Sequence, residues 1–75
     1  MPYRTNSDLP DPVQKHLPTA AQTIYRESFN HAWQTYRKDP RQEEIAHRVA
    51  WAAVKRSYRK SGETWVSREV RASRH

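Results

Sequence analysis

The chain has 75 residues, a formal net charge of +6 at pH 7 and no cysteine. A chain of this length forms one small domain, and the lack of cysteine excludes disulfides, thiolate nucleophiles and Cys-ligated zinc sites. Three Trp, four Tyr and one Phe supply much of the apolar area for a core. The longest apolar run, residues 49–54, is too short to span a bilayer, and no signal peptide is recognisable. We therefore expect a cytoplasmic protein without membrane insertion.

Prolines divide the first half of the chain into helical segments. Asp11 and Pro12 suit the cap and first turn of a short helix that ends before Pro18. Thr19 and Gln22 have the spacing of a capping box, which predicts the start of a second helix. Apolar residues then recur on one side of this helix: Ala21, Ile24, Tyr25, Phe29, Ala32, Trp33 and Tyr36. The pattern predicts an amphipathic helix of about five turns whose apolar face packs on a core.

A third helix is predicted from Asp39-Pro40 onward, with acidic residues in its first turn. Its apolar residues cover more than half of the helical wheel: Ile45, Ala46, Val49, Ala50, Trp51, Ala53, Val54 and Tyr58. This arc is too broad for one buried stripe, so we expect the third helix to be the central one. Gly62 is its expected stop signal. Beyond it, residues 64–66 have strand propensity, as does Tyr3, but propensity alone does not establish a ladder between the two ends.

Positive charge is concentrated in the second half of the chain. Residues 1–40 contain five basic and four acidic side chains, whereas residues 41–75 contain nine and four. At about 100° per residue, Arg41, Arg48, Lys55 and Arg59 fall on one side of the third helix. The predicted anion-binding residues are Arg41, Arg48, Lys55, Arg59, Lys60, Arg68 and Arg71. Such a stripe suits a phosphate backbone; the alternative is a solvated face that keeps the protein soluble.

No constellation in the sequence points to catalysis or to a bound metal. The four histidines, His16, His31, His47 and His75, include no pair three or four residues apart. We therefore predict no metal site and no cofactor. No nucleophile, base or carboxylate pair is spaced for catalysis, so we predict that the protein is not an enzyme. His47 lies on the apolar side of the third helix, and we interpret it as a hydrogen-bonded, partly buried imidazole. The Trp and Tyr residues have core spacing, which favours packing over base stacking.

A series of short motifs runs from the N-terminus to Trp65. They are Met1-Pro2-Tyr3, Leu9-Pro10, Leu17-Pro18, Ala21-Gln22-x-Ile24-Tyr25, Phe29, Ala32-Trp33, Glu44-x-Ala46-His47-x-Val49-Ala50-Trp51-Ala52-Ala53-Val54-Lys55 and Tyr58. In this series the chain resembles the ChaB family. The resemblance implies a mainly α fold, with three compact helices and a small β-sheet formed by the N-terminal and C-terminal segments. It also implies a regulator of a cation antiporter, and it brings no catalytic residues. We place the ChaB-like domain at residues 1–66 and interpret residues 67–75 as a basic, flexible tail.

The connection between the second and third helices departs from the family pattern. Transporter-associated members tend to carry a longer acidic loop there, whereas this chain has only Arg37-Lys38-Asp39-Pro40. The short basic connection favours an anionic partner. We therefore predict a monomeric, non-enzymatic accessory or regulatory protein that binds nucleic acid, or another acidic macromolecule, and has no small-molecule substrate. The alternative hypothesis is an adaptor that acts on the cytosolic face of a cation antiporter.

Overall fold

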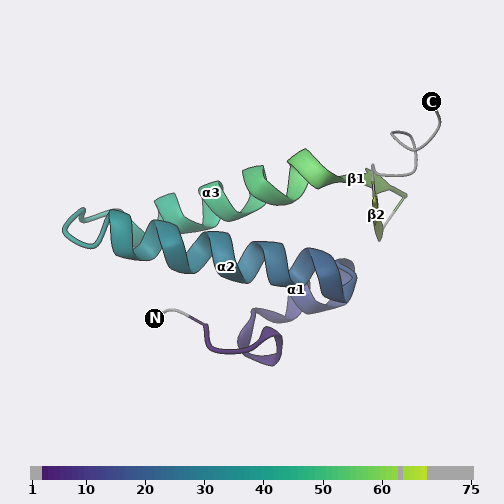
Figure 1. Cartoon of the computed structure of the whole chain (residues 1–75), viewed down its shortest axis with the longest axis horizontal. Helices are drawn as coiled ribbons and strands as arrows, with labels where there is room; N and C mark the ends of the chain where they lie inside the picture. The colour runs from purple at the N-terminus through teal and green to yellow at the C-terminus, as the bar shows by residue number, and fades with distance from the viewer. Residues whose placement is uncertain (1–2, 63, 68–75) are drawn as a thin grey trace.

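The computed structural model describes residues 3–62 and 64–67. The elements in chain order are a 3-10 turn η1 (Asn6–Asp8), helices α1 (Asp11–His16), α2 (Thr19–Thr35) and α3 (Gln42–Ser57), and strands β1 (Tyr58–Ser61) and β2 (Thr64–Ser67) (Figure 1). The predicted fold class, mainly helical with three α-helices and a small β-sheet, is confirmed. In this part of the chain no helix is long and apolar enough to cross a membrane.

Helix α2 lies at the centre of the fold. It packs against α3 on one side, and it also contacts η1 and α1 (Figure 1). The expectation that α3 is the central helix is therefore wrong. The N-terminal residues Leu9, Val13 and Leu17, each 3% exposed, join the same buried cluster as the side chains of α2 and α3. Of the broad apolar arc of α3, only Ala46, Ala50, Ala53 and Val54 are buried, whereas Ile45, Val49 and Trp51 are half-buried.

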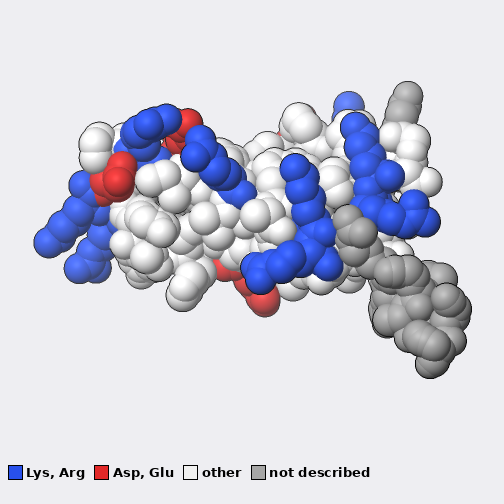
Figure 2. Space-filling view, turned by 90° about the horizontal axis from the view of Figure 1, so that it is seen from above, with Lys and Arg blue, Asp and Glu red and all other residues white. Residues whose placement is uncertain are grey.

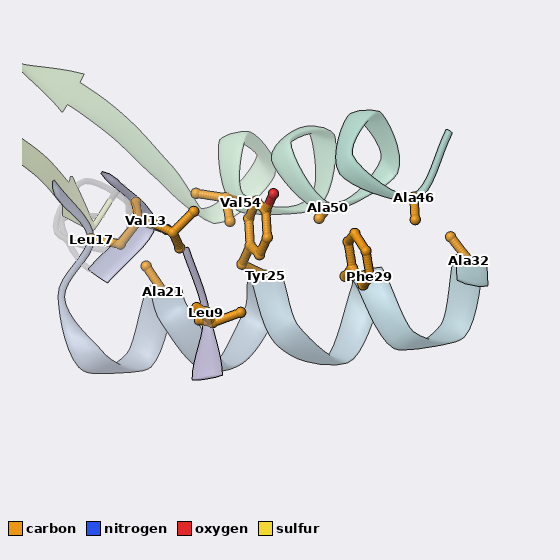
Figure 3. Close-up of a cluster of buried hydrophobic side chains, with 10 residues drawn as sticks. All are labelled: Leu9, Val13, Leu17, Ala21, Tyr25, Phe29, Ala32, Ala46, Ala50 and Val54. Carbon is orange, nitrogen blue, oxygen red and sulfur yellow. The ribbon is translucent and has the colours of Figure 1, made fainter. Parts of the chain in front are cut away.

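The core combines large side chains of α2 with small side chains of α3. Its buried members are Leu9, Val13, Leu17, Ala21, Tyr25, Phe29, Ala32, Ala46, Ala50 and Val54 (Figure 3). The rings of Tyr25 and Phe29 point toward α3, where Ala46 and Ala50 leave room for them. Burying a side chain of this size contributes roughly 1.5–3 kcal/mol to folding. Tyr36, expected in the core, is 41% exposed because α2 ends at Thr35.

The start of α2 differs from the predicted capping box. Pro18 occupies the N-cap position, and the side chain of Thr19 does not cap the helix. The Nε2 group of Gln22 instead donates hydrogen bonds to the carbonyl oxygens of Leu17, at 2.8 Å, and Gln14, at 3.3 Å. These carbonyls belong to the last turn of α1 and its C-cap, which have no partner within the short helix. Gln22 therefore joins α1 to α2.

The sheet is a C-terminal hairpin. Strands β1 and β2 are antiparallel, with Tyr58 opposite Ser67 and Ser61 opposite Thr64. Gly62 has a φ of 66° and lies in the turn, a conformation that glycine adopts without strain. It is therefore not the stop signal of α3, which ends five residues earlier at Ser57.

The pairing of β2 with β1 replaces the expected ladder between the two ends of the chain. The backbone of Tyr3 is bound to the side chain of Asn30 on α2: its N–H donates to Oδ1, and its carbonyl accepts from Nδ2, both at 2.8 Å. A side-chain amide thus provides the partner that a strand would have provided. Closing a short turn also costs less chain entropy than joining residues more than fifty positions apart.

A contact between two tryptophans holds the hairpin on α3. The ring centroids of Trp51 and Trp65 are 5.7 Å apart, and Trp51 packs edge-on against Tyr25 at 5.2 Å. An isolated two-stranded hairpin is only marginally stable in water, and this ring contact, together with Tyr58 packed against the core, supports it. Ser67 is the last residue of β2. Residues 68–75 lie outside the described residues, so the tail and the domain boundary at residue 66 stay predictions.

Candidate anion-binding surface

The predicted basic residues do not form one continuous helical stripe. Arg41 is the N-cap of α3, whereas Arg48 and Lys55 lie within the helix. Arg59 and Lys60 belong to β1, since α3 ends before them. Arg68 and Arg71 lie outside the described residues, and their predicted role is not tested. The structure therefore divides the remaining five residues between the two ends of α3.

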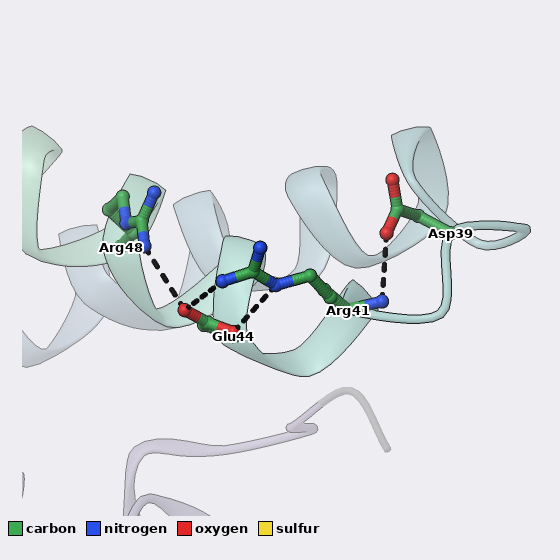
Figure 4. Close-up of polar contacts among 4 residues, drawn as sticks. All are labelled: Asp39, Arg41, Glu44 and Arg48. Carbon is green, nitrogen blue, oxygen red and sulfur yellow. Dashed lines mark hydrogen bonds and ion pairs between the residues drawn. The ribbon is translucent and has the colours of Figure 1, made fainter.

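At the start of α3, the carboxylate of Glu44 pairs with two of these arginines (Figure 4). The guanidinium of Arg41 donates to both carboxylate oxygens of Glu44, at 3.0 and 2.9 Å, and Arg48 donates to one of them at 3.1 Å. The Asp39 carboxylate accepts the backbone N–H of Arg41 at 2.8 Å. The hydrogen bond from Arg41 holds the pKa of the Glu44 carboxyl below its usual range and raises the pKa of Arg41. The two arginines are thus already engaged by a carboxylate.

The other end of α3 presents a different set of charges, which we call the basic end. It comprises Lys55, Arg56, Arg59 and Lys60, all exposed. Figure 2 shows Lys and Arg side chains gathered over this end, whereas the opposite end of the molecule carries both signs of charge. Among the carboxylates that the structure describes, none forms an ion pair with Arg56, Arg59 or Lys60. The basic end is therefore the part of the predicted surface that can receive an anion.

Arg56 belongs to the basic end but was not among the predicted anion-binding residues. On a continuous helix it points away from the face of Arg48 and Lys55. Arg56 lies in the last turn of α3, which ends at Ser57, and the basic residues of β1 follow directly after this turn. The signal in the sequence is the pair of dipeptides Lys55-Arg56 and Arg59-Lys60, separated by two residues, close to the end of the helix.

His47 has the structural role that the sequence predicts. The hydroxyl of Tyr25 is hydrogen-bonded to Nδ1 of His47, whose side chain is 34% exposed. Burial raises the pKa of Tyr25 to about 12, so the hydroxyl keeps its proton at neutral pH and can donate to Nδ1. On the outer side of the ring, Nε2 lies 3.8 Å from a carboxylate oxygen of Glu43. The interpretation of a hydrogen-bonded, partly buried imidazole is confirmed.

Two other kinds of site considered from the sequence are a metal site and a base-stacking surface of Trp and Tyr residues. Within residues 3–62 and 64–67, no three His, Asp or Glu side chains lie together as metal ligands would. Trp33 stacks on Phe29 with ring centroids 5.7 Å apart, and Trp51 lies between Tyr25 and Trp65. These rings serve the core and the attachment of the hairpin, as the core spacing predicts.

The geometry defines a class: a small helical protein in which a helical pair, covered by an N-terminal segment, carries a basic β-hairpin on its last helix. The sequence pattern of the ChaB family matches residues 9–68. The chain belongs to the ChaB family.

Relatives of known name support this assignment. The chain is 54% identical over 66 residues to proteins of Escherichia coli (strain K12) and Shigella flexneri, each named "Putative cation transport regulator ChaB"; the match covers 80% of this chain and 87% of each relative. It is also similar to the NMR solution structure of a protein with the same name. That similarity has a TM-score of 0.80 and 49% identity, and it covers 89% of this chain and 99% of the other.

Proposed function

We propose that this chain is a non-enzymatic, cytoplasmic regulatory protein that binds the phosphate backbone of nucleic acid through its basic end. The observation that carries the proposal is the absence of a described carboxylate partner for three exposed cations, Arg56, Arg59 and Lys60. Cations that pair with none of the described carboxylates keep their charge for an external anion. Arg41 and Arg48 contribute less, because an anion must compete with Glu44 for them.

The expected binding is electrostatic and independent of sequence. Each phosphate contact releases condensed counterions, so that the logarithm of the affinity for duplex DNA falls with a slope of about −0.9 per contact against the logarithm of the salt concentration. The cations of the basic end therefore predict a slope of about −3 to −4. Affinities of this non-specific kind are roughly 10⁻⁴ to 10⁻⁶ M at physiological salt. The described elements contain no dedicated groove-reading motif, which agrees with contacts to phosphate alone.

The test is a titration with duplex and single-stranded oligonucleotides at several salt concentrations, using two matched double variants. Arg59→Gln/Lys60→Gln removes one Arg and one Lys from the basic end, and Arg37→Gln/Lys38→Gln removes the same charges beyond the other end of the helical pair. We expect the first variant to flatten the salt slope by about two, and the second to change it little. Equal effects of the two variants, or no binding at low salt, contradict the proposal.

A second function, an adaptor on the cytosolic face of a cation antiporter, is favoured by the names of the relatives, "Putative cation transport regulator ChaB". In that case the basic end would lie against an acidic surface of the transporter. The test is co-purification of the tagged chain with a cation antiporter from mild-detergent extracts of the membrane fraction. Arg59→Gln/Lys60→Gln should reduce recovery of the antiporter more than Arg37→Gln/Lys38→Gln. Failure to recover any cation antiporter under conditions that preserve complexes counts against this function.

A further inference from the structure

The outer edge of the hairpin at the basic end is paired with no strand among the described residues. In the described residues the sheet consists only of β1 and β2, paired with each other, so that the outer edge of each strand has no strand partner. Arg59, Lys60 and Ser61 of β1 are exposed, whereas the last three residues of β2 are half-buried. The outer edge of β1 is therefore the more accessible of the two.

Backbone groups on this edge are oriented to accept another strand. In an antiparallel pair, successive residues point their N–H and C=O groups alternately toward the partner strand and away from it. Ser61 and Thr64 flank the turn and face each other across the ladder, which makes Lys60 the next outward-facing residue of β1. Unpaired groups of this kind are a template for an incoming extended chain. The contact between Trp51 and Trp65 holds the hairpin, and with it this strand edge, on α3.

The charges on β1 determine which chain fits. Two copies of this protein joined through their β1 edges would bring Arg59 and Lys60 of one copy close to the same residues of the other, and like charges on adjacent strands are destabilising. Basic residues protect an edge in this way against self-association and against neutral strands. They do not oppose an acidic strand, whose carboxylates would gain contacts with Arg59 on one face of the sheet or with Lys60 on the other.

We propose that the outer edge of β1 binds an extended, acidic polypeptide segment, which adds to the hairpin as a third strand. The recognition elements are the outward N–H and C=O groups of Lys60 and the side chains of Arg59 and Lys60. This inference goes beyond the proposed binding of nucleic acid, because it requires backbone hydrogen bonds between strands and not charge alone. With four residues in β1, the added strand is short and the contact is reversible.

The experiment compares two synthetic peptides of equal charge. One alternates Glu and Val over six residues, and the other has the same sequence with N-methyl groups on alternate residues, which remove donors that a strand needs. We expect the N-methylated peptide to bind about tenfold more weakly, as loss of one or two hydrogen bonds predicts. We also expect the unmodified peptide to slow hydrogen exchange at the Lys60 amide, measured by NMR. Equal affinities of the two peptides overturn the proposal.

Two variants of one residue separate backbone pairing from charge in the protein itself. Lys60→Gln removes the charge and keeps the N–H, whereas Lys60→Pro removes both, at an edge position where proline is tolerated. We expect Lys60→Pro to weaken binding of the unmodified peptide further than Lys60→Gln does; equal losses contradict the proposal. If Lys60→Pro disturbs the hairpin, seen as altered Trp65 resonances, the comparison of the two peptides on the unmodified protein decides.

The oligonucleotide titration described above runs beside the peptide titration and tests the proposed function separately. Oligonucleotide binding without peptide binding overturns the strand-addition proposal and leaves the proposed function intact. If the unmodified peptide binds more tightly than the N-methylated one and no oligonucleotide binds, the strand-addition proposal is supported and the proposed function is overturned.

Discussion

The helical core and the basic end differ in the burial of their side chains. In the core, Tyr25 and Phe29 are each 1% exposed and pack against alanines of α3, with no buried polar side-chain atom left unsatisfied among the described residues. At the basic end the charged residues are all exposed, and Trp65 of the hairpin packs on Trp51 of α3. Stability and binding are thus assigned to separate residues, so that one can be changed with little effect on the other.

The largest expected effect is in the core. Phe29→Ala should lower the free energy of unfolding by about 3–5 kcal/mol, because it removes a buried ring that contacts both Tyr3 and Trp33 and leaves a cavity. Urea denaturation monitored by circular dichroism measures the change. Tyr36→Ala, at a site that is 41% exposed, is the control and should cost less than about 0.5 kcal/mol. Similar costs for both variants would remove the distinction between core and surface.

A smaller effect is expected where the hairpin meets α3. Trp65→Ala removes the ring pair with Trp51, a contact worth about 0.5–1.5 kcal/mol beyond the area it buries. We expect the hairpin amides to lose protection in NMR hydrogen exchange while those of α2 keep theirs. Val66→Thr, which preserves a β-branched residue on the same strand, should retain hairpin protection. Loss of protection in α2 together with the hairpin would show that the two regions fold as one unit.

The bond between Tyr25 and His47 joins α2 to α3 within the core. Tyr25→Phe removes the hydroxyl and should lower the free energy of unfolding by about 0.5–1.5 kcal/mol, the usual net value of one hydrogen bond. Urea denaturation at pH 7 measures it. Tyr36→Phe, at the exposed end of α2, is the matched control and should have no measurable effect. Equal stability of Tyr25→Phe and the unmodified protein would contradict a stabilising role for this bond.

The same tyrosine predicts a dependence of stability on pH. Burial raises the pKa of Tyr25 from 10.0 to about 12, so that between these values the unfolded chain releases its proton while the folded protein keeps it. The stabilisation linked to this group is fully present below pH 10 and is lost as the pH rises toward 12. The urea midpoint should therefore fall across this range, and it should fall less in Tyr25→Phe. Parallel curves for the two proteins would disprove the assignment to Tyr25.

The smallest effect on stability is expected at Glu44. Glu44→Gln removes an exposed carboxylate, and ion pairs of this kind contribute little to folding. We expect an unchanged urea midpoint but tighter oligonucleotide binding with a steeper salt slope, because Arg41 and Arg48 become available to phosphate. Glu27→Gln, an exposed acid on α2, changes the net charge equally and is the control. An equal gain in binding for both variants would indicate net charge alone as the cause.

Much of the candidate surface could be predicted from the sequence. The concentration of basic residues after residue 41 identified Lys55, Arg59 and Lys60, which lie at the basic end. The pairing of Glu44 with Arg41 and Arg48 was also readable, because residues three and four apart are neighbours on a helix. The end of α3 at Ser57 could not be predicted from the sequence, because Tyr58 continues the apolar period of the helix.

The sequence by itself determined the number of helices, their approximate positions and the family. These features depend on residues a few positions apart, on motif order and on caps, all of which a linear pattern records. Only the tertiary structure decided that α2 is central, that Asn30 binds Tyr3, and that β2 pairs with β1. Each of these outcomes depends on which surfaces are buried together across long stretches of chain. The competing arrangements share the same local pattern and differ only in packing and in the entropy of chain closure.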